Sequence, residues 1–248
     1  MSLNLVNPDQ TIKDGINFLM SIMQKTGKKN LLVAVSGGID SALSLSLAVR
    51  AAGANNVHAL FLPYKDQSTA DSAEIARWNN LPAQNIHEVN IGSMVDAAAE
   101  KLQAAGDELR LGNIMARMRM IAVYDLAKQL DALVCGTENK SEKYLGYFTR
   151  FGDEASDLEP IQHLYKTQVR QLVEHLNMPK VFLEKPPSAG LWQGQTDEQE
   201  LGFSYEEADK VLAELIDGER LELDPAIKEK VIVRVRSQHF KHEVPYTL

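Results

Sequence analysis

The run Ser36-Gly37-Gly38-Ile39-Asp40-Ser41 carries the most structural information in this sequence, because an apolar run precedes it and a helix-forming run follows it. Residues 31–35 read Leu-Leu-Val-Ala-Val, which is typical of a buried strand, and helical periodicity begins at Ala42. A strand, a glycine-rich turn and a helix start in this order predict a binding site for phosphate groups. The first amides of a helix lack intrahelical partners, and the helix dipole favours negative charge there.

The acidic residue in this loop is informative about its ligand. Asp40 would repel a bare phosphate, so its presence predicts Mg²⁺ between the carboxylate and the phosphate. The loop lacks the Gly-Lys-Ser/Thr ending of a Walker A motif, so the lysine that reaches the terminal phosphates there is missing. The alternative interpretation is a serine–glycine turn in an ordinary strand–helix–strand unit.

The rest of the chain alternates between short apolar runs and longer helical patterns. We expect strands over residues 31–35, 57–62, 85–89 and 132–135, and helices over 42–52, 69–79, 93–104 and 112–130. Residues 231–235 fit either a short strand or a helical turn. Strands that alternate with helices of this length predict an α/β fold, a doubly wound and mostly parallel sheet with helices on both faces. Ligands of such sheets bind at the carboxyl ends of the strands, where the loop at 36–41 falls.

Composition narrows the class of protein. With 248 residues and 44% hydrophobic content, we expect a single domain. The net charge of −8 argues against a nucleic acid partner. No apolar run is long enough to span a membrane and no signal peptide opens the chain, so we expect a cytoplasmic protein without a membrane partner. The single cysteine, Cys135, ends an apolar run and is expected to be a buried core residue rather than a nucleophile.

The loop resembles the SGGxDS loop of the ATP pyrophosphatase (PP-loop) superfamily. Several further stretches together resemble the ammonia-dependent NAD synthetases, in the order and approximate spacing of that family: residues 112–120, 135–142, 146–153, 164–169 and 187–202. The resemblance implies an adenine nucleotide alpha hydrolase-like fold and one NAD synthetase domain over 1–248 without a glutaminase domain. It also implies a homodimer, and small-molecule substrates: deamido-NAD, ATP and ammonia.

The resemblance also implies a set of site residues. Asp40 and Glu142 are expected to hold Mg²⁺, and Asp153 and Asp157 are the catalytic candidates, Asp153 by helping to deprotonate ammonium. The ATP-binding residues are expected to be Ala34, Val35, Ser36, Gly37, Gly38, Ile39, Asp40, Ser41, Thr137, Lys166 and Ser188. The residues expected to bind deamido-NAD are Arg117, Arg150, Asp157, His239 and Lys241.

The sequence departs from the family pattern at two places. Arg150 stands where the family usually has lysine, which keeps the charge and changes the donor geometry. Near the C-terminus, residues 239–242 read His-Phe-Lys-His in place of the usual His-Lys-Arg. Arg119 lies two residues from Arg117 and therefore points to another side of their helix, where we expect it to pair with an acid. Residues 185–202, with their prolines and glycines, are expected to form a lid over ATP.

Two other classes of function compete with this reading. One is a different PP-loop ligase, either a tRNA-modifying enzyme or a GMP synthetase-type domain, but a tRNA enzyme should carry basic patches that this acidic chain lacks. The other is a non-catalytic module that binds a nucleotide as a signal. The several separated polar stretches are more than such a module needs.

Overall fold

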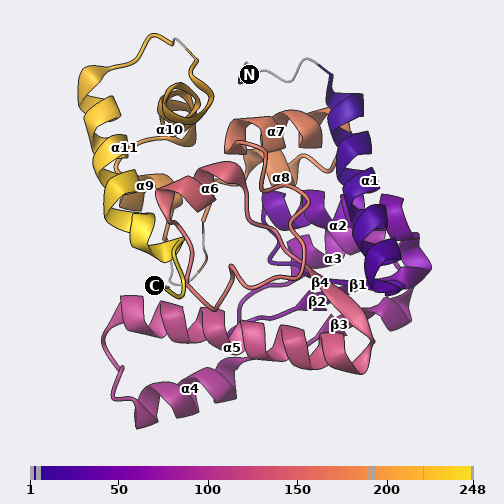
Figure 1. Ribbon diagram of the computed structural model, residues 1–248. Helices are drawn as coiled ribbons and strands as arrows, with labels where there is room; N and C mark the ends of the chain where they lie inside the picture. The colour runs from indigo at the N-terminus through magenta and orange to yellow at the C-terminus, as the bar shows by residue number, and fades with distance from the viewer. Residues whose placement is uncertain (1–2, 4–6, 189, 191–193, 220, 247–248) are drawn as a thin grey trace.

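The computed structural model of the protein describes residues 3, 7–188, 190, 194–219 and 221–246. Within them the strands β1 (Asn30–Ala34), β2 (Val57–Phe61), β3 (Ile86–Glu88) and β4 (Ala132–Cys135) form one parallel sheet in the order β3-β2-β1-β4 (Figure 1). The chain begins at β1, moves outward through β2 to β3, and then crosses to the other side of β1 for β4. The boundary between β1 and β4 is therefore the topological switch point of the sheet. The predicted doubly wound α/β fold is confirmed.

Both faces of the sheet are covered by helices. Successive residues of each strand point to opposite faces, so each strand contributes to two cores. Leu31 and Val33 of β1 pack in a core with α1 (Pro8–Thr26), α2 (Ile39–Ala52), α3 (Ala70–Trp78), α7 (Lys166–His175) and α8 (Val181–Glu184). Leu32, between them, packs in a second core with α4 (Gly92–Lys101) and α5 (Glu108–Gln129). Figure 1 shows α4 and α5 together on one side of the sheet. The two short 3-10 turns, η1 (Ala54–Asn56) and η2 (Ala83–Asn85), precede β2 and β3.

A third apolar cluster lies outside the sheet, where the C-terminal helices, orange to yellow in Figure 1, pack together. It includes Leu145, Tyr165, Val211 and Val231. The elements of this part are α6 (Lys140–Leu145), α9 (Asp197–Leu201), α10 (Tyr205–Leu212), the π-helical turn η3 (Ala213–Asp217), α11 (Pro225–Gln238) and the 3-10 turn η4 (His239–Lys241). Residues 231–235 lie inside α11, which settles the choice between strand and helix in favour of helix.

Most predicted elements are present, but some boundaries differ for local reasons. Helix α2 begins at Ile39 and not at Ala42, because Gly38 is its extended N-cap residue, so Asp40 and Ser41 belong to the first helical turn. The segment 185–202, expected to form a lid, contains the short helix α9. In the described part of the chain, no helix combines the length and the apolar character needed to cross a bilayer.

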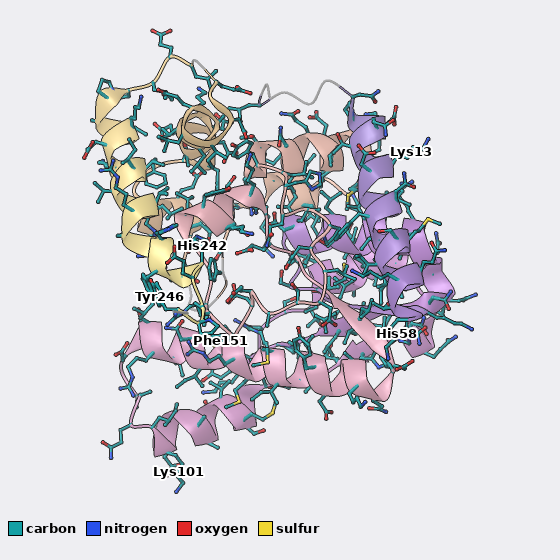
Figure 2. All side chains as sticks on the ribbon, in the orientation of Figure 1. Lys13, His58, Lys101, Phe151, His242 and Tyr246 are labelled. Atoms are coloured by element: carbon teal, nitrogen blue, oxygen red, sulfur yellow. The ribbon has the colours of Figure 1, made fainter. Side chains whose placement is uncertain are left out.

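Two histidines meet on neighbouring strands. His58 Nδ1 of β2 lies 3.1 Å from His87 Nε2 of β3. Burial lowers the pKa of both imidazoles from the ordinary value of 6.5, and His87 lowers the pKa of His58 further. Figure 2 shows His58 on the opposite side of the molecule from His242. A hydrogen bond between two imidazoles needs one donor and one acceptor, so the pair fits only while at least one ring is neutral.

We predict that this pair makes the fold less stable as the pH falls below about 6.5. In that range the unfolded chain binds more protons than the folded one, because the folded pKa values are lowered, and stability then decreases with decreasing pH. Urea unfolding of the wild type and of His87→Gln at about pH 7.5 and about pH 5 measures the effect. The variant should lose less stability between the two pH values. Other histidines contribute equally to both proteins, so equal losses would contradict the prediction.

Candidate functional site

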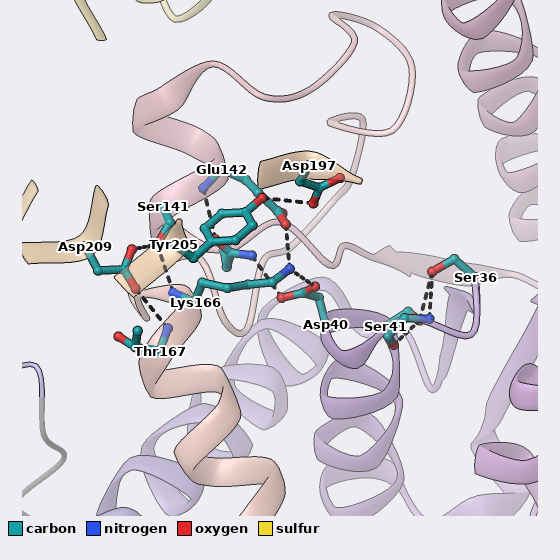
Figure 3. Close-up of polar contacts among 12 residues, drawn as sticks. Ser36, Asp40, Ser41, Ser141, Glu142, Lys166, Thr167, Asp197, Tyr205 and Asp209 are labelled. Atoms are coloured by element: carbon teal, nitrogen blue, oxygen red, sulfur yellow. Dashed lines mark hydrogen bonds and ion pairs between the residues drawn. The ribbon is translucent and has the colours of Figure 1, made fainter. Parts of the chain in front are cut away.

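The loop between β1 and α2 lies at the switch point and leaves the start of α2 open to an anion. The N-cap residue, Gly38, has no side chain and so makes no side-chain capping hydrogen bond. Ser36 and Ser41 instead bond within the loop: their hydroxyl oxygens are 3.2 Å apart, and Ser41 Oγ donates to the Gly38 carbonyl at 3.0 Å (Figure 3). Uncapped amides at the positive end of a helix are a ready site for phosphate.

The turn itself requires glycine. Gly37 has φ +79°, and a Cβ atom there would lie 3.0 Å from Asp71 Cβ, at the start of α3. Ser72 Oγ of the same helix donates to the Val35 carbonyl at 2.8 Å. The N-terminus of α3 therefore packs closely against the loop, and the positive φ together with this close approach favours glycine at position 37.

A buried ammonium joins the two predicted metal-binding carboxylates. Lys166, the first residue of α7, places Nζ 2.5 Å from Asp40 Oδ2 and 2.8 Å from Glu142 Oε1 (Figure 3). Only 4% of the lysine side chain is exposed. Burial alone would lower the pKa of Lys166, but the two carboxylates outweigh it and hold this pKa above its ordinary value. Asp40, Glu142 and Lys166 come from three helices, so this contact fixes α2, α6 and α7 relative to one another.

Asn139 supports both carboxylates at once. Its Nδ2 donates to Asp40 Oδ1 at 2.9 Å, and its Oδ1 accepts from the Glu142 amide at 2.9 Å as the N-cap of α6. The side chain is fully buried. One amide group therefore orients Asp40 and begins the helix that carries Glu142.

A second set of buried polar groups binds the backbone amides of Lys166 and of the next residue, Thr167. The Lys166 amide donates to Ser141 Oγ at 2.8 Å, and Ser141 Oγ donates to Asp209 Oδ1. Asp209 Oδ2 accepts from the Thr167 amide at 2.9 Å. The Tyr205 ring lies 5.0 Å from Lys166 Nζ, within the range of a cation–π contact. The first turn of α7 is thus tied to α6 and α10.

Thr137 follows β4, at the same edge of the sheet as the loop. The chain leaves here and returns to the same place: the Gly136 amide donates to the Leu158 carbonyl at 2.8 Å, and the Lys140 amide to the Leu164 carbonyl at 2.7 Å. Asp157 lies on the returning segment, next to the single bridge between Leu158 and Cys135, and its Oδ2 accepts from the Val134 amide at 2.7 Å. The excursion 140–164 is therefore closed at its base.

Two more carboxylates, Glu138 and Glu159, lie where the chain leaves β4 and returns to it. Glu159 Oε2 accepts from the Glu138 amide at 3.1 Å, and Gln162 Nε2 donates to Glu138 Oε2 at 2.6 Å. Burial raises the pKa of Glu138 to about 8, with a further contribution from Glu159, and burial raises the pKa of Glu159 to about 7. Both groups take up a proton near neutral pH.

Two of the residues expected to bind deamido-NAD, Arg117 and Arg150, are in contact at the segment after α6. Arg117 Nε of α5 donates to the Arg150 carbonyl at 3.3 Å, and the Thr149 amide donates to Asp153 Oδ1 at 2.9 Å. Arg119 points elsewhere, as expected, and the acid Asp153 interacts with it through its charge. The Arg119 guanidinium donates to the Leu62 carbonyl and to Gln67 Oε1, both at 3.1 Å.

The C-terminal pair His239 and Lys241 lies beside a cavity of about 460 Å³. The cavity is lined by Glu138, Lys143, Tyr144, Phe148, Glu154, Gln162, Val235, His239, Lys241 and His242. None of the residues 34–41 is among them. The structure therefore places these two predicted substrate residues beside a cavity that the phosphate loop does not line.

Ser188 lies on the segment predicted to be a lid. Its Oγ accepts from the Gly190 amide at 3.1 Å, while Gln67 Nε2 donates to the Gly190 carbonyl at 2.8 Å. Lys185 Nζ lies 2.6 Å from Asp71 Oδ2, and Asp71 borders Gly37. This part of the segment is thus connected to the phosphate loop through α3. Residues 189 and 191–193 of the predicted lid lie outside the described residues.

Several site residues were not found from the sequence. Asn139, followed three residues later by an acid, has the pattern of a helix start and could have been chosen on that signal. Ser141, Tyr205 and Asp209 carry no local signal, because their roles depend on contacts with Lys166 and Thr167, far away in the sequence.

An uncapped helix start at the switch point of a parallel sheet, beside paired carboxylates, defines a nucleotide-binding α/β protein. The sequence model of the NAD synthase family matches residues 11–245. The NH(3)-dependent NAD(+) synthetase of Picrophilus torridus is 40% identical over 92% of this chain and 90% of its own length. The chain belongs to the NAD synthase family.

Solved structures agree with this assignment. The NMN synthetase from Francisella tularensis superposes with a TM-score of 0.87 and 33% identity, covering 98% of this chain and 99% of the other. The NH3-dependent NAD synthetase from Campylobacter jejuni gives a TM-score of 0.83 and 30% identity, covering 98% of this chain and all of the other.

We predict that Lys166→Met lowers the free energy of unfolding at neutral pH by about 3 kcal/mol, because it leaves two part-buried carboxylates without their cation. Urea unfolding followed by circular dichroism measures the change. Lys65→Met is the matched control, since Lys65 pairs with Asp96 at 3.2 Å on an exposed surface. The control should lose less than about 1 kcal/mol. Similar losses in the two variants would contradict a structural role for the buried contact.

Proposed function

We propose that the protein catalyses the ATP-dependent amidation of deamido-NAD with ammonia. The pyridine carboxylate attacks the α-phosphorus of ATP, which forms an acyl-adenylate and releases pyrophosphate. Ammonia then attacks the acyl carbon, and AMP leaves as the amide of NAD forms. The observation that carries this proposal is the uncapped start of α2 at the switch point, with Asp40 beside Glu142 and Lys166.

The donor set at this place fits Mg²⁺. Asp40 and Glu142 approach the same ammonium, so one cation can be shared by both, and carboxylate oxygens are the protein ligands that Mg²⁺ prefers. Two carboxylates and one ammonium also leave an excess of negative charge. Among the described residues no group of three or more His, Cys, Asp or Glu side chains converges, which suits an ion completed by phosphates and water. When bound, Mg²⁺ neutralises charge on the transferring phosphoryl group.

We assign the ATP site to the loop and its neighbours. Residues 36–41 and the start of α2 receive the phosphates, with Ala34 and Val35 beside them at the end of β1. Lys166 brings a positive charge toward the same phosphates, and Thr137 stands at the end of β4. Ser188 approaches from the segment that contacts Gln67 and Asp71. Phosphate oxygens held by fixed amides and cations need little rearrangement in the transition state.

We assign deamido-NAD to the adjoining segment. Arg117 and Arg150 supply positive charge for a dinucleotide that carries two phosphates. Asp157, which accepts from the Val134 amide at the edge of β4, is assigned to the same substrate. Asp153 accepts a hydrogen bond from the Thr149 amide, and its carboxylate is the base that we propose to accept a proton from ammonium. His239 and Lys241, which line the cavity described above, complete the assignment.

The assembly and location are further parts of the proposal. We expect a homodimer in the cytoplasm, as the family resemblance implies. Helix α5 exposes Leu109 and Ile121, 69% and 51% accessible, which a second copy would cover. Light scattering during gel filtration tests the dimer.

A second substrate follows from the comparison with the NMN synthetase. That enzyme has the same fold over nearly the whole chain, and the corresponding acid, nicotinic acid mononucleotide, offers the same pyridine carboxylate without the adenylate half. The two acids should therefore be compared as substrates at equal concentration. A higher kcat/KM for the mononucleotide would replace deamido-NAD in the proposal and leave the chemistry unchanged.

We predict that Asp40→Asn abolishes the reaction, with a decrease of at least about a hundredfold, because charge on the transferring phosphoryl group is no longer neutralised. The assay follows AMP, pyrophosphate and the amide product from ATP, Mg²⁺, ammonium and deamido-NAD. Circular dichroism must show an intact fold. A folded variant that releases AMP at a near-normal rate would refute the assignment of Asp40. Wild-type protein without any product would refute the proposed function itself.

We predict that ammonium and not glutamine is the nitrogen source. Releasing ammonia from glutamine needs an activated nucleophile, and the single thiol of the chain is unsuited to it. Cys135 is 1% exposed, and burial raises its pKa well above the ordinary value. Because ammonium must lose a proton before attack, the rate should rise with pH. Cys135→Ser should keep most of the ammonium-dependent rate. Equal rates of NAD synthesis from glutamine and from ammonium by the purified protein would contradict this prediction.

A further inference from the structure

The end of α6 is held by two cations from the C-terminal helix and turn. Arg234 Nε of α11 donates to the Leu145 carbonyl at 2.9 Å. Lys241 Nζ of η4 donates to the Gly146 carbonyl at 2.6 Å and to the Phe148 carbonyl at 2.8 Å. Three carbonyls within four residues are thus bound by side chains that lie far away in the sequence.

These carbonyls have a physical need for donors. The last carbonyls of a helix have no intrahelical partner, and the negative end of the helix dipole favours cations. Helix α6 ends in the left-handed conformation at Gly146, with φ +59°. A Cβ atom there would lie 2.4 Å from Gln238 Cβ, so α11 packs directly on the turn. Helix α11 therefore contacts the end of α6 both by close packing and through the charged side chain of Arg234.

The segment that leaves this turn carries the predicted substrate residues. Arg150 is held on both sides: its carbonyl accepts from Arg117 Nε at 3.3 Å, and its guanidinium carbon lies 5.3 Å from the Phe240 ring. Arginine stacks on aromatic rings more readily than lysine does. Arg150 and the stretch 239–242 are also the two places where this sequence departs from the family pattern that it resembles, and the structure brings Arg150 and Phe240 into contact.

We propose that Lys241 is a positioning residue, which fixes the segment 146–150 through the Gly146 and Phe148 carbonyls and thereby holds Arg150 where the acid substrate binds. Two of the three ammonium donors are already used by these carbonyls. Lys241 therefore acts on the substrate through the backbone of the segment. The effect on the substrate rests on the proposed function, whereas the ordering of the segment does not.

Hydrogen exchange of the free protein tests the ordering without any assay of activity. The amides of Gly146, Tyr147 and Gly152 are bonded within the segment, to the carbonyls of Lys143, Glu142 and Thr149. In Lys241→Met these amides should exchange at least about fivefold faster than in the wild type, because local opening becomes easier. Unchanged exchange would overturn the proposal and is the result expected of a lysine that only touches substrate.

Steady-state kinetics tests the consequence. Lys241→Met should raise the KM for deamido-NAD about tenfold, the effect of losing two charge-assisted hydrogen bonds that order the site, and leave the KM for ATP and kcat within about twofold. Lys241→Arg keeps two donors and should restore most of the loss. Lys228→Met is the matched control on α11, since Lys228 pairs with Glu214 outside the site. A lower kcat with unchanged KM, an equal effect of the control, or no rescue by arginine would each overturn the proposal.

A protein that binds neither acid would fail the proposed function and still permit the exchange measurement. If Lys241→Met does not fold, Lys241→Gln replaces it, because the amide keeps N–H donors but lacks the positive charge and is one bond shorter. It should show the same faster exchange and the same rise in KM, each to a smaller extent. A folded Lys241→Gln with wild-type exchange would overturn the proposal in the same way.

Discussion

The buried ammonium of Lys166 is the interaction on which the arrangement of the site depends. An ammonium removed from water needs negative partners close by, and its partners here come from the first turns of α2 and α6. The lysine itself begins α7, whose backbone amides are bound by Ser141 and Asp209. If any of these helices moved, a charge would be left unpaired in a nearly water-free place. Charge balance therefore fixes the geometry of the phosphate loop more strictly than apolar packing alone would.

Much of the fold follows from local sequence pattern. Strand β1 is apolar at every core position because both faces of a central parallel strand are covered, and the glycines after it must form a turn. The position of the phosphate loop at the carboxyl edge then follows from the topology of parallel sheets. The helix boundaries are less local. Helix α2 starts at Ile39 because Gly38 is extended, a backbone choice that the periodicity of side chains does not encode.

The site is predictable only where one residue's chemistry is decisive. Asp40 stands out because an acid in an anion-binding loop needs a cation. The contacts of Arg119 cannot be predicted in this way, since its hydrogen bonds go to a carbonyl and a side-chain amide that no charge pattern indicates. The same limit applies to Lys241, which resembles an ordinary exposed cation until its two carbonyl partners are seen. Groups that act on the backbone leave little trace in the sequence, because a carbonyl is present at every residue.

The closed base of the excursion 140–164 has a consequence for how such a protein can change. The chain leaves β4 and returns to it through backbone hydrogen bonds of Gly136, Asp157 and Leu158, so the edge of the sheet depends on these residues and not on residues 143–156 between them. Insertions or exchanges within residues 143–156 leave the contacts of Ser141 and Glu142 with Lys166 in place, and with them the phosphate loop. The stretch 143–156 is therefore the natural unit to exchange between two proteins that share this scaffold.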